Sequence, residues 1–434
     1  MVSKLLIVTA SAALLAGATS ALAADPVLPA SSSSFAMTSN GALVDRFHAG
    51  RNEAPLWLRD VGATDQLLAL LRTATVDGFA AGPALAVEAE AQVVRARAGD
   101  AAASKSAERL LSSAWLRYLD VLYAPVPGVI YGDAWVRSRV PPPAYSLQQL
   151  AKAPSLAVAV NDVARLNPIR AQLREATLRE AALPGGGQSS VLKANLDRAR
   201  MLPETGRYVM VDVPSARLWM YENGKPVDSM KVVVGTNETQ TPMVASVIYY
   251  ATLNPYWHVP NTLVLKTVAP GVIKGGAAYL KTRGYEIVDR WANDAAIITP
   301  DKIDWKAVAA GTVEVKVRQR PNGMNSMGKM KFPFPNPEGI FLHDTPAREH
   351  FAKTNRSISN GCIRLEDARR FGRWLLGSDP TTMSSLPEQF VQLPRGVPVY
   401  VTYFTARPEG ATIAYAKDVY GLDQLSGSRI VSAR

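Results

Sequence analysis

The sequence predicts an α+β protein in two parts, a helical N-terminal part followed by a β-rich part. Apolar residues recur every three to four positions across 43–184, the spacing of a helix face. Residues 205–405 instead carry short, β-branched runs bounded by turn residues. The run Pro184-Gly185-Gly186-Gly187 separates the two patterns. With 434 residues and a hydrophobic content of 47%, the chain is long enough for two or three domains with buried cores.

The N-terminus predicts export. Lys4 precedes the apolar stretch Leu5–Leu15 and the small-residue site Ala21-Leu22-Ala23, so residues 1–24 are typical of a secretory signal peptide. An N-terminal anchor is the weaker interpretation, because a spanning helix needs about 20 apolar residues. Residues 25–42 are rich in Pro, Ser and Ala and indicate a flexible linker. We expect a periplasmic protein with no integral membrane segment after signal cleavage.

Residues 43–184 predict a helical domain. One apolar face is expected at Leu111, Trp115, Tyr118 and Leu122. Two helix starts can be placed by residue type. Thr64-Asp65 indicates a cap before a leucine-rich run, and Asn167-Pro168 indicates a cap followed by Pro at the first helical position.

The β-rich domain is predicted over 205–405, after a linker at 185–204 and before a C-terminal tail at 406–434. Asn223-Gly224 between two strand-like runs predicts a tight hairpin. Residues 258–330 have a mixed pattern and are expected to form a lid-like insertion over the sheet. Gly271, Gly275 and Gly276 are expected in its loops.

The charge balance favours a polyanionic partner without identifying it. The chain has 48 Lys and Arg residues against 37 Asp and Glu residues, a net charge of +11. Such a charge suits nucleic acid, an anionic membrane face or an acidic cell-wall polymer. The sequence contains no zinc finger, P-loop or dense basic run, so nucleic acid is the weakest of the three.

One segment, 339–367, concentrates residues with catalytic chemistry. It holds Cys362, the single cysteine of the chain, and His343 at the end of a short apolar strand. An exported structural cysteine normally has a disulfide partner. Cys362 has none in the chain, so it is either a small buried hydrophobe or a thiol kept for chemistry. Only roughly a tenth of a free thiol is ionised near neutral pH, and a neighbouring imidazole that accepts its proton would make it a nucleophile.

The segment resembles the catalytic core of the L,D-transpeptidases, the YkuD-type domain. That family has a His followed by a Ser/Thr-x-Gly-Cys-x-Arg signature, which Ser359, Gly361, Cys362 and Arg364 fit, with His343 upstream. Further matches, in the family's order, are Val232-Val233-Val234-Gly235, Thr241-Pro242, Asn254–Pro260 and Asn325-x-x-Gly328. The chain most resembles the large Gram-negative periplasmic subgroup, whose catalytic domain follows a helical scaffold.

The resemblance implies a mechanism. Cys362 attacks the carbonyl between the third residue of a peptidoglycan stem, a diamino acid, and the following D-Ala. His343 accepts and returns the proton, and the carbonyl of Asp344 or a nearby backbone group holds its other ring nitrogen. The thioester then passes to the amine of a second stem, which gives a 3→3 cross-link. Carbapenems, which resemble strained donors for this family, are expected inhibitors.

Other residues receive less specific roles. Ser359, Asn360 and Gly361 are assigned to the nucleophile loop, where backbone N–H groups would form an oxyanion site. Ser359 is equally well explained as a plain turn residue. Arg364 either pairs with a substrate carboxylate or braces the loop. Trp257 either lines the substrate groove or packs in a core. His258 and His350 are expected to be exposed polar residues, and His48 lies outside the domain.

Two positions depart from the family. Asn360 stands where many members have a His, which leaves His343 as the one candidate base. Phe341 stands where the subgroup commonly has a Tyr, so any role of that hydroxyl is absent or supplied by another side chain. No separate peptidoglycan-binding module is found within the scaffold.

Neither a metal nor an organic cofactor is implied, since a Cys and a His suffice for acyl transfer. Three alternatives stay open. Water as acceptor would make the protein an L,D-carboxypeptidase or endopeptidase, and a protein Lys would make it a protein-to-peptidoglycan ligase. A non-catalytic cell-wall scaffold is the more distant alternative, in which Cys362 is dispensable.

Overall fold

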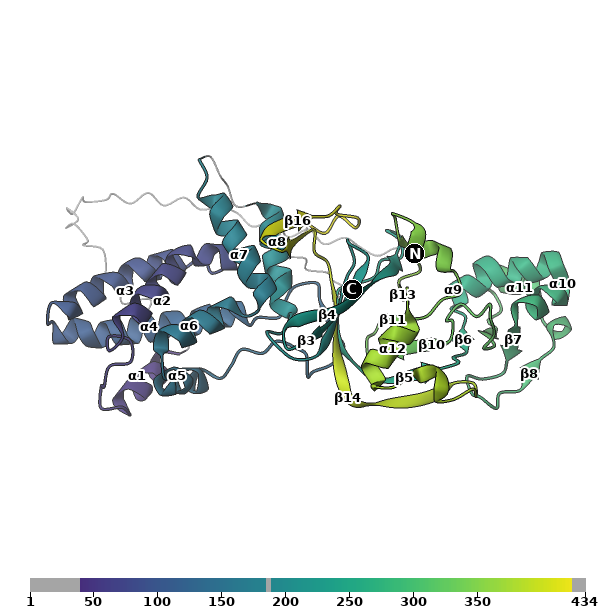
Figure 1. Ribbon diagram of the computed structural model, residues 1–434, viewed down its shortest axis with the longest axis horizontal. Helices are drawn as coiled ribbons and strands as arrows, with labels where there is room; N and C mark the ends of the chain where they lie inside the picture. Colours follow the sequence, from purple (N-terminus) through teal and green to yellow (C-terminus); the bar gives the residue numbers. More distant parts are fainter. Residues whose placement is uncertain (1–39, 185–188, 424–434) are drawn as a thin grey trace, which may run out of the picture.

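The computed structural model describes residues 40–184 and 189–423. The molecule is elongated, with helices at one end, a large sheet in the middle and a small α/β insertion at the other end (Figure 1). The expected signal peptide, and all but the last three residues of the expected linker at 25–42, lie outside the described residues.

The N-terminal part is helical, as the apolar spacing predicts. The helices are α1 (Gly41–Ala49), α2 (Val61–Thr73), α3 (Gly82–Arg97), α4 (Ala101–Leu122), α5 (Pro143–Lys152), α6 (Leu156–Arg165) and α7 (Pro168–Ala181), with a 3₁₀ turn at Ala74–Asp77. The predicted face of α4 is confirmed, because Leu111, Trp115, Tyr118 and Leu122 are each at most 1% exposed.

The two predicted helix starts have different outcomes. Asn167 caps α7 as expected, since its side chain accepts the backbone N–H of Arg170. The cap predicted at Thr64-Asp65 is wrong, because Asp60 caps α2 by accepting the N–H of Ala63. Thr64 lies inside the helix, where its hydroxyl donates to the carbonyl of Trp57.

The central sheet has the strand order β1-β5-β10-β11-β13-β4-β3-β2-β14, with β12 beside β4. Its strands are β1 (Ile130–Tyr131), β2 (Tyr208–Asp212), β3 (Arg217–Glu222), β4 (Lys225–Gly235), β5 (Val244–Leu253), β10 (Met330–Pro333), β11 (Phe341–His343), β12 (Ser357–Ser359), β13 (Ile363–Leu365) and β14 (Gln389–Thr402). The long β14 also pairs with β5, so the sheet closes on itself. Helix α12 (Ala368–Leu376) packs on its core through Phe371 and Leu375.

The hairpin predicted at Asn223-Gly224 joins β3 to β4. Both residues have positive φ, 52° and 74°, and the flanking Glu222 and Lys225 are paired across the turn. These angles are the ones that a two-residue hairpin requires and that Asn and Gly adopt at low cost.

Residues 257–319 form a unit with a sheet of its own, at the far end in Figure 1. The sheet has the order β6-β9-β7-β8, and its elements are β6 (Trp257–His258), α9 (Asn261–Leu263), a π-helical turn (Val264–Val268), α10 (Ala269–Arg283), β7 (Tyr285–Val288), β8 (Ile297–Ile298), a 3₁₀ turn (Pro300–Lys302), α11 (Trp305–Ala309) and β9 (Lys316–Gln319). A separate apolar cluster holds α10, α11 and this sheet together. Gly271, Gly275 and Gly276, which we expected in loops, lie within α10; only Gly276 is non-helical, with φ 62°.

The two segments expected as linker and tail are also partly folded. Within 185–204, α8 (Ser190–Arg198) and a 3₁₀ turn (Ala199–Met201) bury Leu192 and Leu196 against α7 and Phe404. Within 406–434, β15 (Ala406–Glu409) and β16 (Thr412–Tyr415) form a hairpin, and Tyr420 joins the core of the large sheet. Both segments fold because they carry apolar side chains that pack against the large sheet and are removed from water there. None of the described helices is long and apolar enough to cross a bilayer.

Candidate active site

Three adjacent strands place the candidate residues on one face of the large sheet. Lys331 of β10 is in register with His343 of β11, which is in register with Arg364 of β13. Residues in register point to the same face, so these three side chains form one row. The neighbouring residues Phe332, Leu342 and Ile363 form the opposite row, and each is 0% exposed in the core.

Cys362 directly precedes β13 and is therefore expected on the face of Arg364, two residues on. The strand spacing puts its Cα about 8 Å from that of His343, diagonally across two parallel strands. Because both side chains lie on the same face, the thiol and the imidazole can approach each other across this Cα–Cα distance. This arrangement comes from the β11–β13 pairing, which joins the two ends of the segment picked out by sequence.

The Cys362 residue is partly exposed, and its thiol lies 3.9 Å from the carbonyl oxygen of Gly339. Burial of the sulfur raises the pKa of Cys362. A hydrogen bond from the Phe341 backbone and the charges of Arg364 and Lys331 act in the opposite direction. The thiol is therefore protonated at neutral pH, because the hydrogen bond and the two cations only partly offset the effect of burial.

His343 is 2% exposed, and its Nδ1 lies 2.5 Å from the carbonyl oxygen of Asp344. A carbonyl can only accept, so Nδ1 carries the hydrogen and Nε2 keeps a lone pair. Burial, followed by the charge of Arg364, lowers the pKa of His343 to about 3. The ring is a neutral acceptor over the physiological range, the state that a general base needs before reaction.

The loop before Cys362 is held by side chains on both sides. The Ser359 hydroxyl donates to the Cys362 carbonyl at 2.7 Å and accepts the N–H of Gly361 at 3.2 Å. Gly361 has φ 105°, a conformation that favours glycine, and an added Cβ would lie 3.0 Å from Ile340. Ser359 thus shapes the loop. The Gly361 N–H is already engaged by Ser359, so it is not aimed at a substrate oxyanion in this structure. Asn360 is exposed at the loop tip.

The other expected residues lie at different distances from this row. Phe341 is next to His343, with 5.8 Å between ring centroids, and Asp344 serves through its carbonyl. Trp257 belongs to the small sheet, where it packs against the apolar cluster of residues 257–319 near Tyr285. Its surroundings there match the core-packing interpretation.

Arg364 has a partner that sequence reasoning missed. Its guanidinium lies 3.2 Å from Nδ1 of His350, which is only partly exposed although we expected it on the surface. His258 is exposed as expected and stacks on Trp291. Arg364 therefore contacts the turn at Arg348–Ala352 and places a desolvated charge on the face of His343, and burial lowers its pKa.

Lys331 was also missed. Its Nζ lies 3.5 Å from Glu388 Oε1 and 5.7 Å from the Phe341 ring centroid. The one sequence signal is that it alternates with the buried Met330 and Phe332, which puts a charged residue on the non-core face of a strand. Among the residues that the structure describes, no group of His, Cys, Asp and Glu has the arrangement of a metal site.

Comparison with known proteins finds similar domains in both parts of the chain. Residues 206–401 match the model of the L,D-transpeptidase catalytic domain, named YkuD, and residues 42–176 match that of a scaffold domain. A Haemophilus influenzae protein, whose name assigns it provisionally as an L,D-transpeptidase, is 27% identical over 394 residues, 88% of this chain and 78% of its own length.

Solved L,D-transpeptidases give only distant structural matches. One from Mycobacterium smegmatis has 12% identity and a TM-score of 0.23, over 46% of this chain and 59% of its own. One from Enterococcus faecium has 12% identity and a TM-score of 0.23, over 50% and 64%. The chain thus spans less than two thirds of either, and scores this low add nothing to the assignment.

Proposed function

We propose that this chain, whose residues 206–401 match the YkuD-type L,D-transpeptidase catalytic domain and whose residues 42–176 match a scaffold domain, cross-links peptidoglycan stems through a Cys362 thioester. His343 is the general base and acid. The donor is a tetrapeptide stem that ends in D-Ala, and the acceptor is the side-chain amine of a second stem's diamino acid. The expected product is a 3→3 cross-link, formed in the periplasm.

In the first half-reaction, Nε2 of His343 takes the Cys362 proton as sulfur attacks the carbonyl carbon before D-Ala. The tetrahedral oxyanion collapses and the C–N bond breaks. The departing D-Ala amine takes the proton back from Nε2, which leaves a thioester on Cys362. In the second half-reaction the acceptor amine loses a proton to Nε2 and attacks the thioester. The C–S bond breaks, the sulfur regains its proton, and one amide has replaced another.

The observation that carries the proposal is the state of the His343 ring. Its Nδ1 is tied to the Asp344 carbonyl, and its remaining nitrogen is an unprotonated acceptor on the face of Cys362. Arg364 and Lys331 supply positive charge beside both reacting groups. They favour the thiolate and the oxyanion as these form and disfavour a standing imidazolium.

The proposal is tested by incubating the protein with a disaccharide-tetrapeptide and analysing the products by mass spectrometry. Cross-linked dimers with loss of D-Ala are expected. Tripeptide alone would favour the L,D-carboxypeptidase alternative. Stem peptide attached to a supplied protein Lys would favour the ligase. Cys362→Ala is the matched control and should give none of these products.

Acylation alone can be measured with a carbapenem. Intact-mass analysis should show one adduct on the wild-type protein and none on Cys362→Ala. No adduct on either protein, together with an unchanged cellular role of Cys362→Ala, would support the non-catalytic scaffold. The net charge of +11 suits a carboxylate-rich wall polymer, and the expected inability to shift nucleic acid in a gel can be checked in parallel.

A further inference from the structure

A threonine from a distant loop holds the peptide next to the nucleophile. The Thr241 hydroxyl donates to the Gly361 carbonyl at 2.7 Å and accepts the N–H of Gly235 at 2.8 Å. Thr241 is 2% exposed. Gly361 immediately precedes Cys362, so this one hydroxyl connects the end of β4 to the nucleophile loop.

Thr241 is itself held by a residue from the end of the described chain. The Tyr420 hydroxyl donates to the Gly235 carbonyl at 2.7 Å and accepts the Thr241 N–H at 3.2 Å. Tyr420 is 8% exposed, and burial raises its pKa, so the hydroxyl stays protonated. It therefore fixes both the strand end and the threonine that grip the Gly361 peptide.

The position of Tyr420 is set by a second buried tyrosine and a carboxylate. The Tyr420 N–H donates to the Tyr403 hydroxyl at 2.7 Å, and their rings stack with centroids 5.4 Å apart. The Tyr403 hydroxyl donates to Asp418 at 2.6 Å. Asp418 also accepts the N–H groups of Leu422 and Asp423 at 2.9 and 3.0 Å. The segment 418–423 is therefore an ordered turn in which the backbone N–H groups of Tyr420, Leu422 and Asp423 are hydrogen-bonded.

Helix α8 anchors this turn from the scaffold side. Arg198 is 4% exposed and donates to Asp423 at 2.7 Å, to the Tyr403 carbonyl at 3.0 Å and to the Leu422 carbonyl at 2.9 Å. Figure 1 shows α8 between the helical end and the large sheet. A continuous series of buried hydrogen bonds thus runs from α8 to the peptide before Cys362.

We propose that Tyr420 is a positioning residue for Cys362, which it acts on through Thr241 and the Gly361 carbonyl. A peptide unit is planar, so a carbonyl held at Gly361 also holds the N–H and the Cα of Cys362 in the same plane. Loss of the Tyr420 hydroxyl would leave the Thr241 N–H and the Gly235 carbonyl without this partner in a buried site. The proposal rests on the proposed function only where activity is the readout.

The first test uses amide hydrogen exchange, which needs no activity. Tyr420→Phe removes the hydroxyl and keeps the ring. Exchange in the peptides that cover 235–242 and 357–363 should become about tenfold faster, since one net hydrogen bond corresponds to roughly that factor. Peptides of β2 and β3 should be unchanged. Tyr221→Phe is the matched control, because Tyr221 is also 8% exposed but packs on a different cluster.

The second test compares two reactions at the single cysteine. Carbapenem acylation demands an oriented sulfur, whereas iodoacetamide alkylation at high pH demands only an exposed thiolate. Tyr420→Phe should slow acylation about tenfold and leave alkylation within about twofold, since one lost net hydrogen bond corresponds to roughly a tenfold change. Thr241→Val should behave in the same way, and Thr241→Ser should recover wild-type rates because it retains the hydroxyl.

Unchanged exchange at 235–242 and 357–363 in Tyr420→Phe would overturn the proposal, as would equal acylation of the two proteins. A wild-type protein that no carbapenem acylates would count against the proposed function, and exchange alone would then decide the role of Tyr420. If Tyr420→Phe does not fold, the comparison of Thr241→Val with Thr241→Ser still tests the last step of the series, from Thr241 to the Gly361 carbonyl, and equal exchange and acylation in those two variants would overturn the proposal.

Discussion

Two histidines of this chain are almost fully enclosed, and their surroundings suit opposite purposes. His48 in the scaffold is 1% exposed, with Nε2 3.0 Å from the Ser112 hydroxyl and Nδ1 4.0 Å from Glu108 Oε2. His343 is 2% exposed, with Nδ1 on a backbone carbonyl and Lys331 and Arg364 as row neighbours. Burial lowers the pKa of both.

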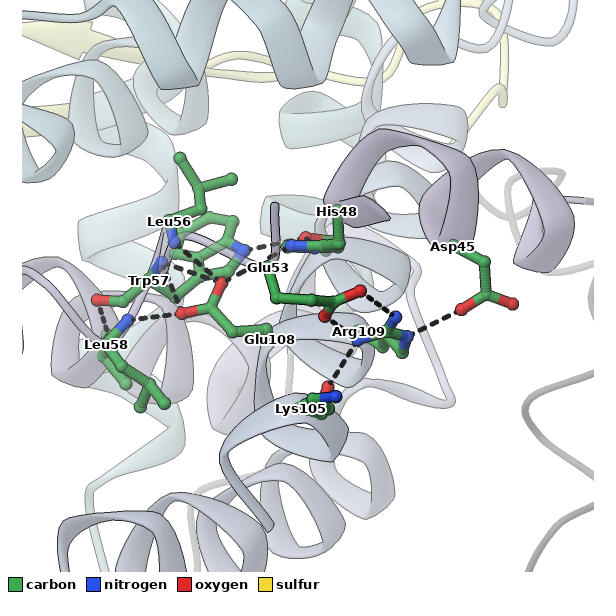
Figure 2. A network of polar contacts seen from close by, with 11 residues as sticks. Asp45, His48, Glu53, Leu56, Trp57, Leu58, Lys105, Glu108 and Arg109 are labelled. Carbon is green, nitrogen blue, oxygen red and sulfur yellow. Dashed lines mark hydrogen bonds and ion pairs between the residues drawn. The ribbon is translucent and has the colours of Figure 1, made fainter. Parts of the chain in front are cut away.

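The two histidines differ in what faces the second ring nitrogen, the one that the first hydrogen bond leaves free to interact. Around His48, a hydroxyl and a carboxylate face the two nitrogens. Figure 2 shows that the Glu108 carboxylate also holds the backbone of Leu56, Trp57 and Leu58. That arrangement stabilises a fold. Around His343 one nitrogen is left as an acceptor near Arg364 and Lys331, so in the proposed function it takes a proton only while negative charge forms on substrate or sulfur. Burial alone therefore does not distinguish a structural histidine from the proposed general base, but the surroundings of the second ring nitrogen do.

The largest effect expected from this comparison is on acylation. His343→Gln should slow carbapenem acylation by about 100- to 10,000-fold, the range that a general base contributes. His48→Gln should leave the rate of the folded protein within about twofold. The measurement is the second-order acylation rate from intact-mass time courses. Similar losses in the two variants would contradict the distinction.

The scaffold side of the comparison is tested at Glu108. Its two oxygens accept the N–H groups of Leu56, Trp57 and Leu58 at 2.9 to 3.1 Å. In Glu108→Gln an NH₂ group faces those donors, so we expect a loss of about 2–4 kcal/mol in the free energy of unfolding. Urea denaturation followed by tryptophan fluorescence measures it.

Glu53→Gln is the matched control for Glu108→Gln. Glu53 pairs with Arg109 at 3.0 Å near the surface (Figure 2). About a third of the Glu53 side chain is exposed. Exposed pairs of this kind contribute little to stability, so only a small loss is expected. An equally small loss in Glu108→Gln would show that the loop 50–60 does not depend on the buried carboxylate.

The pH dependence of stability sharpens the comparison further. The folded pKa of His343, about 3, lies below the unfolded value of about 6.5, so the folded state resists protonation. Its contribution to stability is complete above pH 6.5 and declines as pH falls toward 3. Between pH 6.5 and 4.5 the wild type should lose about 2–3 kcal/mol more than His343→Gln does. Equal losses in urea denaturation at the two pH values would contradict the buried neutral ring.

Local sequence signals predicted much of this molecule. Helix spacing, the Asn167 cap and the Asn223-Gly224 hairpin depend on neighbours within a few residues, and the structure bears them out. One short segment, 339–367, also identified Cys362 and His343 as candidate site residues. That they react together is a proposal. The Thr64-Asp65 cap failed because Asp60, an equally good cap, lies only four residues earlier.

Long-range packing decided the rest. Lys331 comes beside His343 only through the register of β10 with β11, and Thr241 reaches Gly361 across 120 residues. No local spacing encodes either contact. Likewise, the sequence around Tyr420 predicts only a C-terminal tail. Its folded position depends on the contacts of Tyr420 and Asp418 with the distant Tyr403 hydroxyl.

The smallest expected effect concerns Lys331, which supplies charge to the site without a place in the proton transfer. Lys331→Met should raise the pKa of Cys362, because one of the cations that favour its thiolate is removed. The shift should stay below about one pKa unit, or about 1 kcal/mol, since Arg364 remains. The pH dependence of iodoacetamide alkylation at this single thiol measures it. Lys331→Arg should retain the wild-type profile. If Lys331→Met retains it as well, the row of cations beside His343 is screened at the sulfur, and Arg364 alone must favour the thiolate.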